Sequence, residues 1–408
     1  MITRYLQHAL PFKEFIALMA LMMSLVALSI DAVLPALQTI GNSIGVTNAN
    51  DNQFLIGALF IGMGFGQLLF GPLSDSIGRR RSMMMGYAVF FFGSLLTIVA
   101  NDFDSILLGR FLQGFGVAAP RVLTTAIVRD LYEGRAMARV MSFVMMIFIL
   151  VPMLAPIFGQ IILTLANWQS IFVVIALIGF ISLMWYLLRQ GETLAAEDRA
   201  DFTVSRTIQA LKTIIINRVA FGYTIATGIV TGPFIFYLSS AQQLFQNTYG
   251  LAQWFPVYFA GLAFAFGLSS FVNGKQVMKF GMHRIVRFAL LLMTVSSLLF
   301  VFITWCFSGL PVLWITTLYM LLTFFCVGLL FGNLNALAME PLGHIAGIGA
   351  AVVGSLSTFI SAALAVIIGQ QFNETIYPLV ISFSIAGIAT LFLMRWIEGG
   401  EKISAEAR

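Results

Sequence analysis

Long apolar runs alternate with short polar connectors along the whole chain. A membrane-spanning helix needs about 20 mostly apolar residues, because each residue adds about 1.5 Å to the helix. None of the runs has the short alternating pattern that is typical of a transmembrane β-barrel. The pattern therefore predicts an all-α integral membrane protein with twelve transmembrane helices. The expected spans are residues 14–38, 53–73, 82–100, 104–128, 138–164, 168–188, 219–243, 254–277, 285–306, 312–338, 345–370 and 375–396.

Composition supports this interpretation. Hydrophobic residues make up 60% of the 408 residues and charged residues only 10%, against roughly 45–50% and 25% in soluble domains. The mean hydropathy of +0.95 excludes a soluble protein. A formal net charge of +5 could indicate a nucleic acid partner. Because the basic residues gather in the connectors, we instead expect them to fix the orientation of the chain in a lipid bilayer, with no nucleic acid bound.

The distribution of lysine and arginine predicts that orientation. Of 22 such residues, 20 lie in the N-terminal segment, at connectors after even-numbered spans, or near the C-terminus. The other two, Arg110 and Arg121, lie inside the fourth span, and the six connectors after odd-numbered spans contain none. Since basic connectors stay on the cytoplasmic side, both termini are expected in the cytoplasm.

A polar stretch divides the chain in the middle. It contains "GETLAAEDRADF", the least apolar stretch of the sequence, and an apolar pattern of period 3.6 from Val204 to Ile216. That pattern predicts an amphipathic helix lying along the membrane surface. The expected parts are an N-terminal six-helix bundle over 1–188, a cytoplasmic linker over 189–217, a C-terminal six-helix bundle over 218–396 and a cytoplasmic tail over 397–408.

The two halves of the chain share a short repeat. "GPLSDSIGRRR", which begins at Gly71, aligns with "GKQVMKFGMHR", which begins at Gly274, and each follows the second span of its half. Two six-helix repeats related by an axis along the membrane normal form one of the known transporter architectures. The repeat therefore predicts two pseudo-symmetric bundles.

Several motifs resemble those of the major facilitator superfamily. Residues 71–81 resemble the signature of its helix 2–3 loop, "RFLQGFGVAA" (110–119) its helix 4 motif, and "PMLAPIFGQ" (152–160) the helix 5 motif of its antiporter branch. "SIDAVLPAL" (29–37) and "RDLYEGRAMARVMSFVM" (129–145) look most like the drug/proton antiporters of the bicyclomycin-resistance (Bcr/CflA) branch. The resemblance covers essentially the whole chain and implies the fold of that superfamily.

The resemblance implies that the loop after the second span is a conformational latch favouring the outward-facing state. Asp75 can accept hydrogen bonds from a neighbouring helix N-terminus, where the helix dipole favours an anion, or pair with Arg129 or Arg135. The three arginines of this loop can also anchor the chain to anionic lipid, and both roles can coexist. The expected latch residues are Gly71, Asp75, Gly78, Arg79, Arg129 and Arg135.

Charged residues deep inside a span are rare and indicate function by default. Asp31 is the only acid well inside a span, and a lone carboxylate in a low-dielectric cavity can bind and release a coupling proton. It could instead cap a kink near Pro35. The resemblance implies that Arg110 responds to that proton, although it could simply bond backbone carbonyls where helices 1 and 4 meet. Arg121 could draw anionic substrates or pair with a polar partner near the cytoplasmic side.

Proline residues mark the fifth span. Pro152 and Pro156 are expected to bend or loosen the helix, and small residues such as Gly159 to allow close packing between the halves. The resemblance implies a hinge that restricts leakage, although Gln160 stands where the family commonly has glycine. Ordinary transmembrane proline is the alternative.

Aromatic and amide residues near the bilayer midplane are the candidates for a substrate cavity. An apolar cavity with few charges suits lipophilic, amphipathic compounds. Two of the candidate amides, Asn333 and Asn335, cannot share one helical face, so at most one of them points inward. The expected lining is Asp31, Arg121, Phe236, Tyr237, Gln242, Asn333 and Asn335.

The resemblance implies a proton-coupled antiporter that exports lipophilic or amphipathic drugs by alternating access, as a monomer in a bacterial inner membrane. Its partners are then a small-molecule substrate, protons and lipid, and it is driven by the proton gradient. The sequence has no nucleotide-binding loop, zinc motif or nucleophile elbow, so we expect no enzyme activity, metal or cofactor. A same-fold transporter for one siderophore, sugar or metabolite is the alternative. Twelve spans with embedded charges disfavour a sensor or scaffold.

Overall fold

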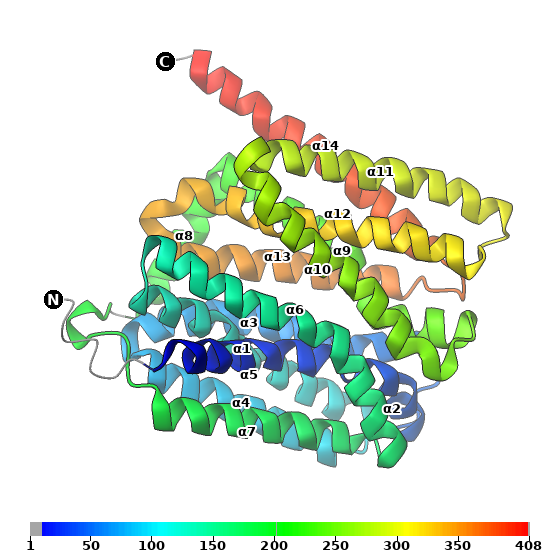
Figure 1. Cartoon of the computed structure of the whole chain (residues 1–408), viewed down its shortest axis with the longest axis horizontal. Helices are drawn as coiled ribbons and strands as arrows, with labels where there is room; N and C mark the ends of the chain where they lie inside the picture. The colour runs from blue at the N-terminus through cyan, green and yellow to red at the C-terminus, as the bar shows by residue number, and fades with distance from the viewer. Residues whose placement is uncertain (1–9, 201, 407–408) are drawn as a thin grey trace. The chain divides into compact units, whose positions relative to one another are not determined.

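The computed structural model describes residues 10–200 and 202–406. Those ranges contain no strand, and twelve of their helices are long and apolar enough to cross a membrane (Figure 1). The predicted all-helical, multi-pass architecture is therefore confirmed.

The chain divides into two compact units, and the first unit comprises the chain up to Thr47 together with Ala58–Ile208. One helix, α3, begins in the second unit and continues in the first. The elements of the first unit are α1 (Phe12–Asp31), η3 (Leu34–Ala36), α2 (Leu37–Ser43), α3 (Phe54–Ile77), α4 (Arg79–Val99), α5 (Phe103–Leu131), α6 (Gly134–Leu165), α7 (Gln169–Arg189) and η5 (Ala196–Asp198).

The second unit comprises Asn48–Gly57 and the chain from Gln209 onward. It contains the first residues of α3, and η6 is a π-helical continuation of α9. Its elements are η4 (Ala49–Gln53), α9 (Arg218–Ala241), η6 (Gln242–Thr248), η7 (Ala252–Trp254), α10 (Phe255–Phe280), α11 (Met282–Cys306), α12 (Leu313–Met339), η8 (Glu340–Ile345), α13 (Ala346–Gly369) and α14 (Tyr377–Glu406).

Close helix packing in the first unit depends on the glycines of the helix 4 motif. A Cβ atom at Gly114 would lie 1.9 Å from the carbonyl oxygen of Leu59 on α3, and one at Gly116 would lie 2.3 Å from the backbone nitrogen of Phe90 on α4. Without a hydrophobic force between helices in lipid, such close backbone approach is what holds them together. The motif therefore joins α3, α4 and α5.

The first span is interrupted, whereas the apolar pattern predicted one helix. Regular α-helix ends at Asp31, and a 3-10 turn from Leu34 to Ala36 precedes α2. Pro35 accounts for the break, because proline has no backbone N–H and disfavours helical geometry in the residue before it. Asp31 consequently lies at the end of a helix in the interior of a span.

The linker and the C-terminal helix also show structure. The amphipathic helix predicted over 204–216 is present as α8 (Val204–Ile216), with Ala210 and Ile214 buried, and the two units divide within it at Ile208–Gln209. The stretch from 397 that we expected to be a tail continues α14 as far as Glu406, and its last two residues lie outside the described ranges.

The orientation of the spans generates a first prediction. Alkaline phosphatase fused after Asn101 should be active, because the positive-inside rule places that connector outside the cytoplasm. The same enzyme fused after Arg199 should be inactive, and green fluorescent protein fused after Arg408 should fluoresce. Phosphatase activity at the Arg199 fusion would contradict the orientation.

Candidate functional site

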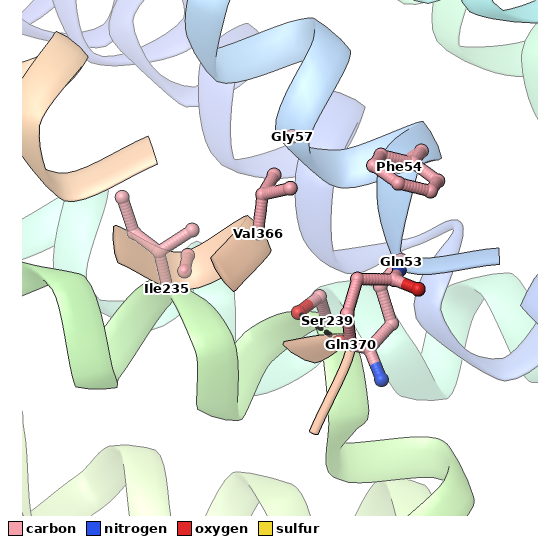
Figure 2. A pocket seen from close by; sticks show the side chains of 8 residues that line it. Gln53, Phe54, Gly57, Ile235, Ser239, Val366 and Gln370 are labelled. Carbon is pink, nitrogen blue, oxygen red and sulfur yellow. Dashed lines mark hydrogen bonds between the residues drawn. The ribbon is translucent and has the colours of Figure 1, made fainter. Parts of the chain in front are cut away.

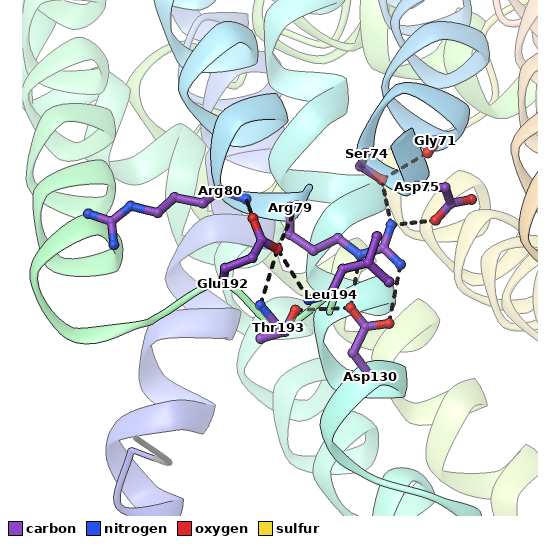
Figure 3. A network of polar contacts seen from close by, with 9 residues as sticks. All are labelled: Gly71, Ser74, Asp75, Arg79, Arg80, Asp130, Glu192, Thr193 and Leu194. Atoms are coloured by element: carbon purple, nitrogen blue, oxygen red, sulfur yellow. Dashed lines mark hydrogen bonds and ion pairs between the residues drawn. The ribbon is translucent and has the colours of Figure 1, made fainter. Parts of the chain in front are cut away.

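Arg79 is the centre of a polar network at the start of α4. Its side chain is only 2% exposed. The guanidinium binds Asp130 at the end of α5 through two hydrogen bonds, from Nε to Oδ2 at 2.8 Å and from Nη2 to Oδ1 at 3.2 Å. Its Nη1 atom donates to Ser74 Oγ at 2.7 Å and pairs with Asp75 on α3 (Figure 3). The pair of hydrogen bonds to the Asp130 carboxylate is the strong, directional form of an arginine contact.

The partners of Asp75 differ from those predicted. Among the described residues it pairs with Arg79 of its own loop, and neither Arg129 nor Arg135 forms an ion pair with it. Both of these arginines are exposed. Consecutive helix residues point about 100° apart, so the inward side chain at the end of α5 is Asp130 and its neighbour Arg129 faces away.

The other positions of the loop have distinct environments. The carbonyl of Gly71, inside α3, accepts a hydrogen bond from Ser74 Oγ at 2.8 Å, whereas Gly78 forms the turn before α4. Arg80 donates to the carbonyl of Leu187 at 2.9 Å. Arg81 is exposed and is the arginine of this loop best placed to contact lipid headgroups or water.

Asp31 is buried in the first unit, with 4% of its surface exposed. The described residues give its carboxyl group no hydrogen bond and no ion pair. Burying an ionised carboxylate without a partner is costly, so the site favours a function over a purely structural role.

Arg110 connects four helices of the first unit. Its Nη2 atom donates to the carbonyl oxygen of Ser29 on α1 at 2.9 Å, and its Nη1 atom to Gln113 Oε1 at 2.9 Å. Gln113 in turn donates to Ser94 Oγ on α4 at 2.9 Å, and the guanidinium lies 5.6 Å from the ring centroid of Phe172 on α7. The contact with Ser29 is the backbone bond considered above, two residues before Asp31.

Arg121 is half-buried on α5. Its Nη1 atom lies 3.2 Å from Met63 Sδ on α3, and a thioether sulfur is only a weak acceptor. The partner of Arg121 is thus a sulfur atom rather than a strong polar acceptor, and the attraction of anionic substrates by this arginine stays a prediction.

The prolines of the fifth span do not break it, since α6 continues through Pro152 and Pro156 to Leu165. Gly159 faces Ala32, the residue that follows α1, in the same unit, whereas we expected packing between the halves. A Cβ atom at this glycine would lie 1.9 Å from the carbonyl oxygen of Ala32. The helix 5 motif therefore packs directly against the interruption that follows Asp31.

The aromatic residues predicted for the cavity lie in the second unit. Phe236 and Tyr237 are both buried, and the Tyr237 ring lies 4.5 Å from the Phe324 ring and is stacked on Phe259 at 5.7 Å. Gln242 is buried and begins the π-helical segment. Such segments occur frequently at functional sites, and the role of these residues in substrate binding stays a prediction.

The two asparagines of α12 have different surroundings, as the helical period requires. Asn333 is buried and donates to Asn273 Oδ1 on α10 at 2.7 Å. Asn335 is half-buried and donates to the carbonyl of Phe331 on its own helix at 2.9 Å. Asn333 is therefore the buried member of the pair, and a place for either residue in the substrate cavity stays a prediction.

A cluster of amides that sequence reasoning missed lies at the start of α3, within the second unit. Gln53 Nε2 donates to Gln243 Oε1 at 2.7 Å, and Asn50 Nδ2 donates to the carbonyl of Phe372 at 2.9 Å. A small cavity lies beside them, with room for roughly one water molecule (Figure 2). Its lining residues are Gln53, Phe54, Gly57, Ile235, Ser239, Ala365, Val366 and Gln370.

Comparison with known proteins agrees with this architecture. Residues 19–366 match the family model described as Major Facilitator Superfamily. The chain belongs to the major facilitator superfamily. Membership confirms the resemblance drawn from the motifs, and it identifies the chain as a transporter of small molecules rather than an enzyme.

Among curated relatives, the MFS-type transporter YdgK of Bacillus subtilis is 31% identical over 353 residues, 85% of this chain and 86% of that protein. A bicyclomycin resistance protein homolog of Haemophilus influenzae is 26% identical over 372 residues, 90% and 91% of the two chains. A chloramphenicol resistance protein of Pseudomonas aeruginosa is 28% identical over 360 residues, 83% and 82% of the two chains.

Among solved structures, the xylose transporter XylE of E. coli has a TM-score of 0.72 over 94% of this chain and 97% of that chain. The two sequences are only 14% identical, so this likeness concerns the fold alone. It supports the twelve-helix architecture derived from the apolar pattern.

The contact of Gly159 with α1 generates a second prediction. The Gly159→Ala variant should unfold at a lower temperature in detergent, because the added Cβ must displace a backbone oxygen, and overpacking of this kind costs roughly 1–3 kcal/mol. The matched control is Gly261→Ala on α10, where a Cβ meets nothing within 4 Å. Equal unfolding temperatures for the two variants would contradict the close contact.

Proposed function

We propose that this protein is a proton-coupled antiporter that exports lipophilic or amphipathic drugs and similar small molecules by alternating access. It acts as a monomer in a bacterial inner membrane, with both termini in the cytoplasm. The observation that carries the proposal is Asp31, a buried carboxyl group without a polar partner among the described residues, at an interruption inside the first span. Bacterial relatives named for resistance to bicyclomycin and chloramphenicol support drugs as the substrate class.

The proton step follows from the environment of Asp31. The ionised form of an unpaired carboxyl group has a high free energy in a low-dielectric site and a low one in water. The protonation of Asp31 therefore depends on whether the site is open to water. Export then alternates two events, in which the carboxyl group takes a proton from one side and gives it up to the other. A bound substrate that brings positive charge or hydrogen-bond donors to the site favours release of the proton.

Arg110 keeps a constant positive charge during this step. A guanidinium stays charged at all relevant pH values, and this one is held by the carbonyl oxygen of Ser29 on the helix that ends at Asp31. Because this hydrogen bond joins Arg110 to α1 two residues before Asp31, a change of charge at Asp31 can act through it on the packing of α1 against α5.

We also assign roles to three other groups of residues: a hinge in α6 at Pro152, Pro156 and Gly159, substrate contacts on and just after α9 and on α12, and a latch around Arg79. Gly159 lies against the carbonyl of Ala32, so a movement of α6 acts on the backbone next to Asp31. Tyr237, Gln242 and Asn333 are proposed as the side chains of the second unit that contact substrate. The network around Arg79 is proposed as the latch, which must rearrange when the transporter changes state.

A third prediction tests the activity itself. Everted membrane vesicles that contain the protein should lose part of a respiration-generated pH gradient when an exported compound is added, because antiport returns protons. The measurement is the recovery of a fluorescent pH-gradient dye across a panel of unrelated amphipathic drugs, with vesicles lacking the protein as control. A response to a single compound class would favour one physiological substrate, and no response to any compound would overturn the antiporter.

A fourth prediction concerns the coupling residue. The Asp31→Asn variant should insert and fold, since the amide has nearly the same shape, but it should lose uphill export because it cannot bind a proton. Substrate binding measured on purified protein should persist. Asp104→Asn, an exposed acid in the first turn of α5, serves as the control and should keep export. Full uphill export by Asp31→Asn would remove Asp31 from the mechanism.

A further inference from the structure

The linker that follows α7 returns to the latch network and contacts the start of α4. Glu192 Oε1 accepts a hydrogen bond from the backbone nitrogen of Arg79 at 2.8 Å, and Glu192 Oε2 accepts one from the backbone nitrogen of Arg80 at 3.1 Å (Figure 3). These are the first two N–H groups of α4, which have no acceptor inside the helix. A carboxylate is also favoured at this end of a helix by the helix dipole.

Gly78 makes this contact possible in two ways. Its φ of +96° lies in the left-handed region, where glycine is favoured over residues with a side chain. A Cβ atom at this position would also lie 2.4 Å from Glu192 Oε2 and displace the carboxylate. The glycine before the arginines therefore leaves space for an acid that lies more than 100 residues further along the chain.

The carboxylate is held in place by its own loop. Glu192 Oε1 also accepts from the backbone nitrogens of Thr193 at 3.1 Å and Leu194 at 3.2 Å. Three N–H groups thus converge on one oxygen, and two of them belong to the linker itself. The linker presents Glu192 to α4 in a preformed geometry.

Two further contacts join the linker to the acids of the latch. Thr193 is buried, and its Oγ1 atom donates to Asp130 Oδ2 at 2.9 Å. That oxygen also accepts from Arg79 Nε. The backbone nitrogen of Ala200 donates to the carbonyl oxygen of Asp75 at 2.9 Å. The linker therefore contacts Arg79 and both of the carboxylate residues with which it pairs.

We propose that Glu192 is a positioning residue for the latch and that residues 192–200, the linker clamp, are released when the latch opens. Glu192 fixes the backbone of Arg79, so that its guanidinium reaches Asp75 and Asp130 together. Through its hydrogen bond to Asp130, Thr193 makes the position of the linker depend on the position of the Asp130 carboxylate. The clamp itself depends only on the geometry above, whereas its effect on transport rests on the proposed function.

A fifth prediction tests the clamp by limited trypsin digestion of everted vesicles, whose outer face is the predicted cytoplasmic side. Arg199 is an exposed trypsin site within the clamp, and a docked segment is cleaved only when it opens locally. Each cleavage rate is divided by the rate for the same protein after denaturation. On this scale, Glu192→Ala should be cleaved after Arg199 several-fold faster than the unsubstituted protein, and Glu192→Asp should restore part of the protection. Glu197→Ala, an exposed acid of the same linker, is the matched control and should leave the rate unchanged.

A double variant separates positioning from simple capping of α4. If Glu192 acts on transport through the Arg79 side chain, then Arg79→Gln alone should lower the maximal rate of gradient loss in the vesicle assay, and adding Glu192→Ala to it should lower that rate little further. Independent, additive effects of the two substitutions would overturn the positioning role. Unchanged cleavage in Glu192→Ala would overturn the clamp.

Transport gives the second measurement. In the vesicle assay, Glu192→Ala should lower the maximal rate of gradient loss for each active drug of the panel while the half-saturating drug concentration stays the same. Faster cleavage with unchanged rates would overturn the role of the clamp in the cycle. If the unsubstituted protein responds to no drug, the proposed function fails, and the digestion experiment still decides the linker clamp.

Discussion

A charged group buried inside a protein or a bilayer is costly unless its neighbours compensate it, and this constraint accounts for the contacts of Arg79 and Arg110 in the first unit. Arg79 has two carboxylate residues around its guanidinium. Arg110 has a backbone carbonyl and an amide oxygen. Asp31 has neither kind of partner among the described residues. The contrast separates two arginines that have polar partners from one carboxyl group that has none among the described residues.

Much of the architecture follows from the order of apolar and polar residues along the sequence. A span is defined by the length of its apolar run and the amphipathic helix over 204–216 by its period of 3.6, so both kinds of helix could be predicted. The bounds of the amphipathic helix agree with the structure, whereas those of several spans differ by a few residues, as for 138–164 against Gly134–Leu165. Asp31 and Arg110 could be identified as candidates because any charge inside an apolar run is conspicuous. A bond from Arg110 to a backbone carbonyl of the first helix could be proposed from the sequence, but the residue that provides it, Ser29, could not, since it lies 81 positions away.

The hydropathy pattern did not predict the interruption after Asp31 or the acids that contact Arg79. Pro35 signalled a break, but hydropathy continues across it and predicts one helix. Asp130 and Glu192 lie outside the apolar runs, where acids are common and carry no special signal. Only the folded chain brings them to Arg79, from α5 and from the linker. The spacing of Gly78 before the arginines had a reason that could be found only with Glu192 in place.

The division of α3 between the two units has a structural consequence. Its residues up to Gly57 belong to one unit and those from Ala58 to the other, although the helix is continuous from Phe54 to Ile77. The boundary therefore falls inside a helix rather than in a connector, and the backbone hydrogen bonds of α3 run across it. One continuous helix thus carries Phe54, which lines the small cavity, at its first turn and Asp75, which pairs with Arg79, at its last.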